Sequence, residues 1–428
     1  MPLPDLMFPL VDKPVAVFGG GLSGRGVVAL LKSHGIDSVI YDEKGVSGGV
    51  TQFRHDQAAT HDLVVYSPGF HARHPWLELA HSCGCNLLGE LDFASMFWDG
   101  KLIAVTGTNG KTTLTEFLTA ALQQQGIVAA AVGNIGYPLS QFVLDNLSDV
   151  GCVVCEVSSF QAESIHYLRP DALLWTNITE DHLDRYADFN EYFLAKWNLV
   201  QRSSKIIVSQ SVAEWAERLG KRLPAITDIV NPDTGKIPTG SCFAAYPQRE
   251  NYWLAERYWQ IEGYDPAVLA AAARTFVRSK HRLELVIKQG EISFWNDSKS
   301  TNFAATLAAL QTFDEPVYWI GGGKLKGGDM RQFVEKLNKK INAAFLIGES
   351  AVDLQAYLEE YGVFVMTCSS LEEALTVALK HVFGKAAIVL SPGFSSQDMF
   401  ADYVERGLRF EKAVMKYVAD ARKASGIN

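Results

Sequence analysis

A glycine-rich run that ends in lysine and two threonines stands between a predicted strand and a predicted helix. Backbone N–H groups at such a helix start, together with the helix dipole, bind anionic phosphate. Lys111 adds a cation for the terminal phosphates of a nucleotide, and the Thr112 hydroxyl can take a Mg²⁺ ligand position. Val105 occupies the place of the first glycine of the common phosphate loop, so this shortened variant predicts ATP binding. The residues of the run are Gly107, Thr108, Asn109, Gly110, Lys111, Thr112 and Thr113.

A second glycine loop, Gly19–Gly24, also lies between a predicted strand and a predicted helix. Asp42 follows at the end of the next predicted strand, which completes the pattern of a dinucleotide fingerprint. The pattern requires only close backbone approach to a phosphate or sugar. NAD and another nucleotide therefore both stay open for this loop.

Oxygen and nitrogen ligands gather after two further predicted strands. Glu156–Gln161 follows the apolar run Cys152–Cys155, and Asn177–Tyr186 follows the run Leu173–Thr176. The carboxyl ends of parallel strands are where open α/β sheets bind ligands. A hard cation that bridges ATP phosphates needs such oxygen ligands, so we expect Glu156 and His182 to take part in a metal site.

The elements that must position these residues alternate as strand and helix along the whole chain, which predicts an α/β fold. The length of 428 residues exceeds what one core usually supports. We expect an N-terminal Rossmann-like domain over residues 1–97, a central P-loop-type ATPase sheet over residues 98–279 and a C-terminal Rossmann-like domain over residues 280–428. The turn-rich stretch Pro224–Gly240 predicts an irregular part of the central domain.

Composition limits the class of partner and compartment. The formal net charge of -9, with no long basic cluster, disfavours nucleic-acid binding. No basic leader precedes an apolar stretch and no apolar run is long enough to span a membrane, so we expect a cytoplasmic protein. We also expect a monomer. Cys152 and Cys155 have CxxC spacing, but their apolar strand favours packing over redox or metal chemistry.

The assembled motifs resemble the Mur ligase family, the ATP-dependent amino-acid ligases of peptidoglycan synthesis, over nearly the whole chain. The strings that carry the resemblance are GTNGKTT, Val132–Gly136, Glu156–Gln161, Asn177–Tyr186, His281–Glu284, Asn296–Asn302 and Leu390–Gly393. Glu156–Gln161 and Asn177–Tyr186 are similar to the branch that adds D-glutamate to UDP-N-acetylmuramoyl-L-alanine. The resemblance implies that the Gly19–Gly24 loop holds uridine diphosphate, which displaces the NAD interpretation.

The same resemblance assigns roles to individual residues. It implies contacts with the UDP substrate from Leu22, Ser23, Asp42, Gly69, Asn134 and Ser159. It implies Mg²⁺, as two ions, near Thr112, Glu156, His182 and a carbamylated Lys196. His281 and Arg282 would approach the reaction centre, and Asp297 and Lys299 the ATP ribose and phosphates. The D-glutamate pocket would comprise Thr301, Lys326, Ser396, Gln397 and Tyr403.

The chain departs from the family pattern in one segment that supports adenine. Where the family has His-Asn-x-x-Asn, this chain reads Glu250–Leu254. The second asparagine of the pattern is missing, because Leu254 stands in its place. This departure motivates an alternative, a nucleotide-binding homologue that has lost ligation. Another Mur-type ligase or a folylpolyglutamate-like ligase remains a further alternative.

Overall fold

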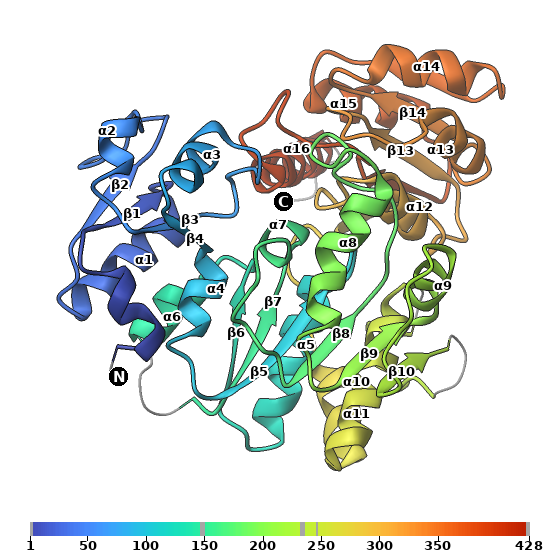
Figure 1. Ribbon diagram of the computed structural model, residues 1–428. Helices are drawn as coiled ribbons and strands as arrows, with labels where there is room; N and C mark the ends of the chain where they lie inside the picture. The colour runs from blue at the N-terminus through green and yellow to red at the C-terminus, as the bar shows by residue number, and fades with distance from the viewer. Residues whose placement is uncertain (1–2, 146–149, 232–235, 245–246, 425–428) are drawn as a thin grey trace. The chain divides into compact units, whose positions relative to one another are not determined.

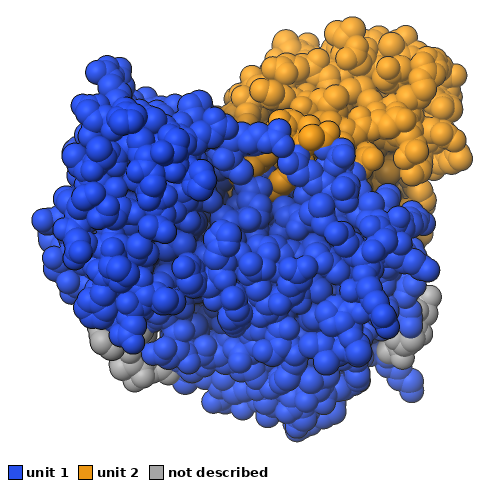
Figure 2. Space-filling model, in the orientation of Figure 1, with its two compact units in different colours: residues 1–178, 188–241, 249–276 blue, residues 179–187, 242–248, 277–428 orange. Residues whose placement is uncertain are grey.

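The computed structural model describes residues 3–145, 150–231, 236–244 and 247–424, and Figure 1 shows its three sheets with flanking helices. The expected α/β class is confirmed. The chain divides into two compact units, coloured separately in Figure 2. Unit 1 comprises residues 1–178, 188–241 and 249–276, and unit 2 comprises residues 179–187, 242–248 and 277–428.

The N-terminal sheet of unit 1 has four parallel strands in the order β2-β1-β3-β4. Aromatic side chains from β1 and β2, such as Phe18 and Tyr41, pack with Phe53 in its core. The glycine loop at residues 19–21 follows β1, where the strand order reverses, which is the usual ligand position of such sheets. The strands are β1 (Val15–Phe18), β2 (Ser38–Tyr41), β3 (Leu63–Tyr66) and β4 (Asn86–Gly89). The helices are η1 (Asp5–Leu10), α1 (Leu22–Ser33), α2 (His55–Ala58), α3 (Pro75–Ser82) and α4 (Glu90–Ser95).

The central sheet of unit 1 has six parallel strands in the order β10-β9-β8-β5-β7-β6. β5 lies between β7 and β8, so the residues that follow these three strands meet at one sheet edge. The strands are β5 (Lys101–Thr106), β6 (Ala129–Gly133), β7 (Cys152–Glu156), β8 (Ala172–Trp175), β9 (Ile206–Ser209) and β10 (Thr227–Val230). The helices are α5 (Lys111–Gln124), α6 (Leu139–Asp145), α7 (Ser159–Ala162), α8 (Phe189–Val200), α9 (Gln210–Arg218), α10 (Gln248–Glu262) and α11 (Pro266–Thr275).

The sheet of unit 2 has the order β11-β12-β16-β13-β14-β15, with only β11 antiparallel to its neighbour. β12, β16 and β13 are adjacent, which brings the loops after them to a common edge. The strands are β11 (Glu284–Gln289), β12 (Ile292–Asn296), β13 (Val317–Gly321), β14 (Ala343–Leu346), β15 (Phe364–Thr367) and β16 (Ala386–Leu390). The helices are α12 (Phe303–Leu310), α13 (Met330–Leu337), α14 (Ala351–Glu359), α15 (Leu371–His381) and α16 (Tyr403–Ala424).

Two buried carboxylates on α4 join the N-terminal and central sheets within unit 1. Glu90 accepts hydrogen bonds from the backbone N–H and hydroxyl of Ser140 at 2.9 and 2.6 Å, and burial raises the pKa of Glu90. Asp92 accepts three backbone N–H bonds of 2.8 Å from residues 166–168. Satisfying buried N–H groups in this way stabilises the junction between the two sheets.

Three local predictions have clear outcomes. Cys152 and Cys155 are buried on β7 as free cysteines, so the packing interpretation is confirmed. The stretch predicted to be irregular contains the edge strand β10, which pairs with β9, while its residues 232–235 lie outside the described part of the chain. Among the residues that the structure describes, no helix is long and apolar enough to cross a membrane.

Candidate active site

The phosphate loop connects β5 to α5, as predicted, and requires glycine at two positions. Gly107 has φ 142°, and a Cβ there would lie 2.0 Å from the Thr176 hydroxyl oxygen. Gly110 caps α5 in the left-handed region with φ 83°. These backbone conformations are open to glycine and strained for other residues. The loop therefore places the N-terminus of a fourteen-residue helix, α5, at its open end.

The segment after β8 supports this loop from the neighbouring strand. The Thr108 N–H donates to the Asn177 carbonyl at 3.0 Å, and the Asn109 N–H donates to the Asn177 side-chain oxygen at 2.9 Å. The Thr176 hydroxyl donates to the Asn109 carbonyl at 2.6 Å. Two residues that the motif reading left without a role thus hold the phosphate loop in shape.

Thr112, Glu156 and Asn134 converge at the carboxyl edge of the central sheet. The Thr112 hydroxyl donates to Glu156 Oε2 at 2.6 Å, and Asn134 Nδ2 donates to Glu156 Oε1 at 2.9 Å. Glu156 is 2% exposed, whereas Asn134 is exposed. The hydroxyl and carboxylate form a set of hard oxygen donors that fits Mg²⁺. The structure thus brings together two of the four residues predicted to hold metal.

Both lysines of the predicted metal and phosphate machinery bond to the loop backbone. Lys111 Nζ donates to the carbonyls of Gly107 and Thr108 at 3.0 and 2.8 Å. Lys196 on α8 is buried, donates to the Gly107 carbonyl at 2.9 Å, and lies 5.0 Å from the Tyr192 ring centroid. Lys196 therefore lies beside the phosphate loop and not on an exposed helix face.

Asn251 is the asparagine that remains in the segment that departs from the family pattern. It lies in the first turns of α10, is 3% exposed, and its Nδ2 donates to the Gly110 carbonyl at 3.4 Å. A Cβ at Gly110 would approach the Asn251 side-chain oxygen to 2.7 Å. The segment that differs from the family pattern therefore still provides an amide beside the phosphate loop. Asn251 and Gly110 are 141 residues apart in the chain, so a local sequence motif does not predict their contact.

The N-terminal glycine loop is held by the acid that completes its fingerprint. The Gly20 N–H donates to Asp42 Oδ2 at 2.7 Å, and the Lys44 N–H donates to Asp42 Oδ1 at 2.9 Å. Leu22, at the start of α1, is 70% exposed. The other predicted contacts of the UDP substrate differ in burial: Ser23 is half-buried, Gly69 is exposed, and Ser159 is buried at the start of α7.

Unit 2 places one of the predicted amino-acid-binding residues, Lys326, beside Asp181, which follows β8 in sequence. Lys326 Nζ donates to the Thr301 hydroxyl at 3.3 Å and lies 3.7 Å from Asp181 Oδ1. Asn302 Nδ2 donates to the second Asp181 oxygen at 3.0 Å. The neighbouring His182 has φ 57° and belongs to the same unit. Asp181 was not singled out from the sequence, although it lies within the string that contains His182.

The loops after β12 and β16 form the adjoining part of unit 2. Asp297 is buried and accepts from Leu283 N–H at 2.9 Å and from the Ser391 hydroxyl at 2.7 Å, and also from Ser300. Lys299 Nζ lies 3.8 Å from the Tyr403 ring centroid. Ser396 is buried and Gln397 is exposed. The buried Asp297 carboxylate thus accepts three hydrogen bonds from neighbouring protein groups.

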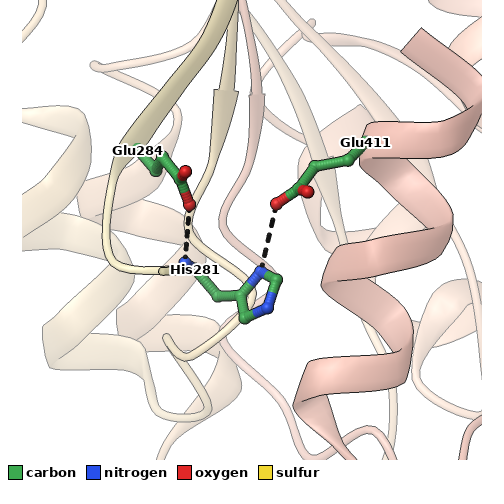
Figure 3. Close-up of side chains that lie close together, drawn as sticks. All are labelled: His281, Glu284 and Glu411. Atoms are coloured by element: carbon green, nitrogen blue, oxygen red, sulfur yellow. Dashed lines mark hydrogen bonds and ion pairs between the residues drawn. The ribbon is translucent and has the colours of Figure 1, made fainter. Parts of the chain in front are cut away.

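His281 and Arg282 immediately precede β11. His281 is 4% exposed and has φ 63°, and its imidazole lies against α16 (Figure 3). Arg282 is half-buried. Of these two residues, only Arg282 is partly accessible to solvent, because His281 is almost fully buried.

Comparisons with known proteins agree with this architecture. Residues 105–229 match the model of the Mur ligase middle domain, and residues 281–394 match that of the Mur ligase glutamate ligase domain. The UDP-N-acetylmuramoylalanine--D-glutamate ligase of Pelobacter propionicus is 31% identical, with 95% of this chain and 99% of the relative covered. The enzyme of the same name from Geotalea daltonii is 30% identical, covering 94% of this chain and 97% of the relative.

Solved structures share the fold at low sequence identity. The UDP-N-acetylmuramate-alanine ligase MurC of Thermotoga maritima has a TM-score of 0.62 and 17% identity, covering 96% of this chain and 100% of that chain. MurF ligase of Thermotoga maritima in complex with ADP has a TM-score of 0.58 and 15% identity, covering 83% of this chain and 96% of that chain.

Proposed function

Since this chain belongs to the Mur ligase family, we propose that it joins D-glutamate to UDP-N-acetylmuramoyl-L-alanine at the expense of ATP, in the cytoplasm and as a monomer. The observation that carries the proposal is similarity over nearly the full length to relatives named as D-glutamate ligases, at 30–31% identity. Full-length similarity matters here because the acceptor amino acid would be chosen by unit 2, outside the phosphate loop.

The reaction must activate a carboxylate, because amide formation from a carboxylate and an amine is uphill in water. A carboxylate oxygen of the L-alanine residue attacks the γ-phosphorus of ATP, and the bond from that phosphorus to the bridging oxygen breaks to release ADP. The amine nitrogen of D-glutamate then attacks the acyl carbon. The bond from carbon to phosphate oxygen breaks, inorganic phosphate leaves, and the ammonium proton is lost to solvent.

The phosphate loop and bound Mg²⁺ would supply the charge stabilisation for the first step. Lys111, the loop N–H groups and the start of α5 would neutralise charge on the β- and γ-phosphates while the negative carboxylate attacks the γ-phosphorus. Mg²⁺, as two ions with Thr112, Glu156, His182 and a carbamylated Lys196 as protein ligands, would offset the phosphate charge when bound. Support comes from the 2.6 Å contact of Thr112 with Glu156 and from the burial of Lys196 beside the loop.

Carbamylation would convert Lys196 from a cation into an anionic oxygen ligand. The neutral amine adds to CO₂, and the product carries a carboxylate in place of a positive charge. This change matches the proposed role, because an anionic ligand beside the phosphate loop suits a divalent ion better than an ammonium group does.

Three further residues are proposed for the nucleotide. Asn251, with its amide beside Gly110, is proposed to take the adenine-supporting role that the family's asparagine segment has. Lys299 is proposed for the phosphates and Asp297 for the ribose. Arg282, half-buried beside His281, would approach the acyl phosphate.

D-glutamate would be recognised mainly by charge. Lys326, at 3.3 Å from the Thr301 hydroxyl, would pair with a carboxylate of the amino acid, and Asp181 opposite it would attract the amine. Ser396, Gln397 and Tyr403 would complete the pocket. The UDP moiety would be held at the N-terminal glycine loop by Leu22, Ser23, Asp42 and Gly69, with Asn134 and Ser159 nearer the reacting carboxylate.

A panel of acceptor amino acids tests the proposal directly. The purified chain is supplied with ATP, Mg²⁺ and UDP-N-acetylmuramoyl-L-alanine, and phosphate release is compared for D-glutamate, L-glutamate, L-alanine, L-lysine and diaminopimelate. Release that depends on D-glutamate, with the corresponding product in the mass spectrum, is expected. Release with a different amino acid would identify another Mur-type ligase. ATP binding without release under any combination would indicate a homologue that has lost ligation.

A further inference from the structure

The imidazole of His281 is held between the end of β12 and the C-terminal helix α16. Asn296 Nδ2 lies 2.8 Å from His281 Nδ1 and donates at 2.8 Å to Glu411 Oε1. Glu411 Oε1 itself lies 3.4 Å from His281 Nδ1. Figure 3 shows Glu411 approaching the ring from α16 while Glu284 approaches the backbone of the same histidine.

The ring nitrogen that faces Asn296 accepts a hydrogen bond. The Ser298 N–H donates to Asn296 Oδ1 at 3.1 Å, which fixes the amide with its NH₂ group toward the histidine. His281 Nδ1 therefore faces an amide NH₂ group, which can only donate. Asn296 is 0% exposed, so breaking this network would leave buried polar groups without partners.

The same three ionisable groups would resemble a metal site if only their spacing were considered. Ligand atoms of His281, Glu284 and Glu411 lie within 4.8 Å of one another. However, Asn296 already occupies the Nδ1 lone pair, and Glu284 Oε2 accepts from the His281 backbone N–H at 3.0 Å. The donor atoms are thus satisfied by groups of the chain, which favours a hydrogen-bonded clasp over an ion.

The clasp continues directly into two residues of the proposed nucleotide site. The Lys299 N–H donates to the His281 carbonyl at 3.0 Å, and Arg282 is covalently adjacent to His281. His281 and Leu283 both have positive φ values, 63° and 49°, which non-glycine residues adopt only when surrounding contacts hold them. The side-chain anchor of His281 therefore fixes a strained backbone on which Arg282 and Lys299 depend.

Gly407 provides the surface on which the imidazole rests. A Cβ at this position of α16 would lie 2.4 Å from His281 Nδ1 and 2.9 Å from its Cε1 and Cγ atoms. Such distances cannot be accommodated without displacement of the ring. Glycine at position 407 therefore leaves the space that the His281 ring occupies.

We propose that Glu411, Asn296 and Gly407 are positioning residues for ATP, and that they act through His281 on Arg282 and Lys299. The proposal rests on the proposed function only in that it takes Arg282 and Lys299 to contact the nucleotide. Because His281 is buried in the clasp, the proposal gives it a positioning role as well. α16, far from these residues in sequence, becomes part of the ATP-binding apparatus.

Variants of Glu411 test the proposal with ATP affinity as the readout. Glu411→Ala removes the 2.8 Å carboxylate partner of Asn296 and leaves its amide the 3.2 Å contact with the Gly407 carbonyl. ATP affinity, measured calorimetrically in the absence of amino-acid substrate, should fall by on the order of tenfold. The KM for UDP-N-acetylmuramoyl-L-alanine should change less than about twofold. Glu411→Gln should restore most of the affinity because its amide oxygen can accept the same bond. Asp420→Ala, at an exposed position of the same helix, should behave as wild type.

Several results would overturn this assignment. Unchanged ATP affinity in Glu411→Ala would do so, as would equal losses for every substrate, which indicate general damage to unit 2. A Glu411→Gln variant no better than Glu411→Ala would remove the hydrogen-bond basis. A wild-type chain that binds ATP but does not ligate D-glutamate contradicts only the proposed function, whereas absence of ATP binding contradicts both.

A double-mutant cycle provides a test that does not depend on Glu411. Gly407→Ala should weaken ATP binding by a factor similar to that of Glu411→Ala, because its methyl group displaces the imidazole. In a His281→Ala background the same change should have no further effect, since the ring is gone. Equal effects of Gly407→Ala in both backgrounds would contradict action through His281.

Discussion

The Thr112 hydroxyl and the Glu156 carboxylate lie 2.6 Å apart, although 44 residues separate them in the chain. They meet because β5 and β7 are neighbours in a parallel sheet. Glu156 is the last residue of β7, and Thr112 lies at the start of α5, after the loop that follows β5. The contact joins the first turn of the phosphate-binding helix to the acid that the sequence singled out. Four experiments on individual residues, and one on the reaction, follow from such contacts.

Glu156→Gln should abolish most activity while leaving the fold intact. The substitution keeps the shape of the side chain but removes the negative charge proposed to bind Mg²⁺, so kcat should fall by at least about 100-fold. The Mg²⁺ concentration needed for half-maximal activity should rise. Glu217→Gln, at an exposed site on α9, serves as the matched control. A variant with wild-type Mg²⁺ dependence would exclude Glu156 as a metal ligand.

Lys196 should make activity depend on CO₂. If the carbamate is required, removal of dissolved CO₂ and bicarbonate should lower kcat, and adding bicarbonate should restore it. Mass spectrometry under non-acidic conditions should detect the added mass of one CO₂ on the peptide that contains Lys196. Lys196→Arg, which stays cationic and cannot form this adduct, should be inactive with or without bicarbonate. Activity that persists in that variant would refute the carbamate.

Lys326→Ala should affect the acceptor amino acid selectively. The variant loses the cation near Thr301 and Asp181, so the KM for D-glutamate should rise by about tenfold or more. The KM for ATP should remain within about twofold of wild type. Lys339→Ala, at an exposed position, is the control. A uniform change in both KM values would mean that Lys326 supports the fold of unit 2 and not the amino acid.

Asp297 should contribute a pH-dependent component to stability. Burial raises the pKa of Asp297 from 3.8 to about 6, against the opposing effect of hydrogen bonds from Ser300 and Ser391. The folded chain therefore retains a proton that the unfolded chain loses as the pH rises above about 4. Stability from this group is fully present below that pH and is lost as the pH rises through about 6, by roughly 3 kcal/mol in total.

The comparison with Asp297→Asn isolates this component, because the variant has no carboxyl group to titrate. The Tm of the wild-type chain should fall relative to that of Asp297→Asn between about pH 4 and pH 6.5, and the difference should then stay constant. Parallel Tm curves for the two proteins across this range would show that the folded-state pKa of Asp297 is not raised.

The sequence predicted the helices, strands and motifs better than it predicted the contacts between residues far apart in the chain. Most strands were evident because four to six consecutive apolar residues suit a sheet covered on both faces. β10 was missed because it is an edge strand whose residues are largely half-exposed and carry little apolar pattern. Glu156 was found because it lies at the carboxyl end of a buried strand, where the sheet-edge rule predicts a ligand site.

Residues that act through distant neighbours had no local signal. Glu411 lies 115 residues from Asn296, and Asn251 lies 141 residues from Gly110, so neither contact follows from spacing along one helix or strand. Asp297 shows the converse case. The motif that contains Asp297 predicted a contact with the nucleotide. The structure adds three hydrogen bonds that the motif does not predict, from the Leu283 N–H and from two serine hydroxyls.

The fate of an oxygen label tests the central claim most directly. UDP-N-acetylmuramoyl-L-alanine with oxygen-18 in the alanine carboxylate is incubated with ATP, Mg²⁺ and the purified chain, with and without D-glutamate. D-glutamate-dependent ligation through an acyl phosphate predicts inorganic phosphate that forms only with D-glutamate and carries one oxygen-18 atom from the substrate. Unlabelled phosphate, or phosphate release that does not depend on D-glutamate, would contradict the account.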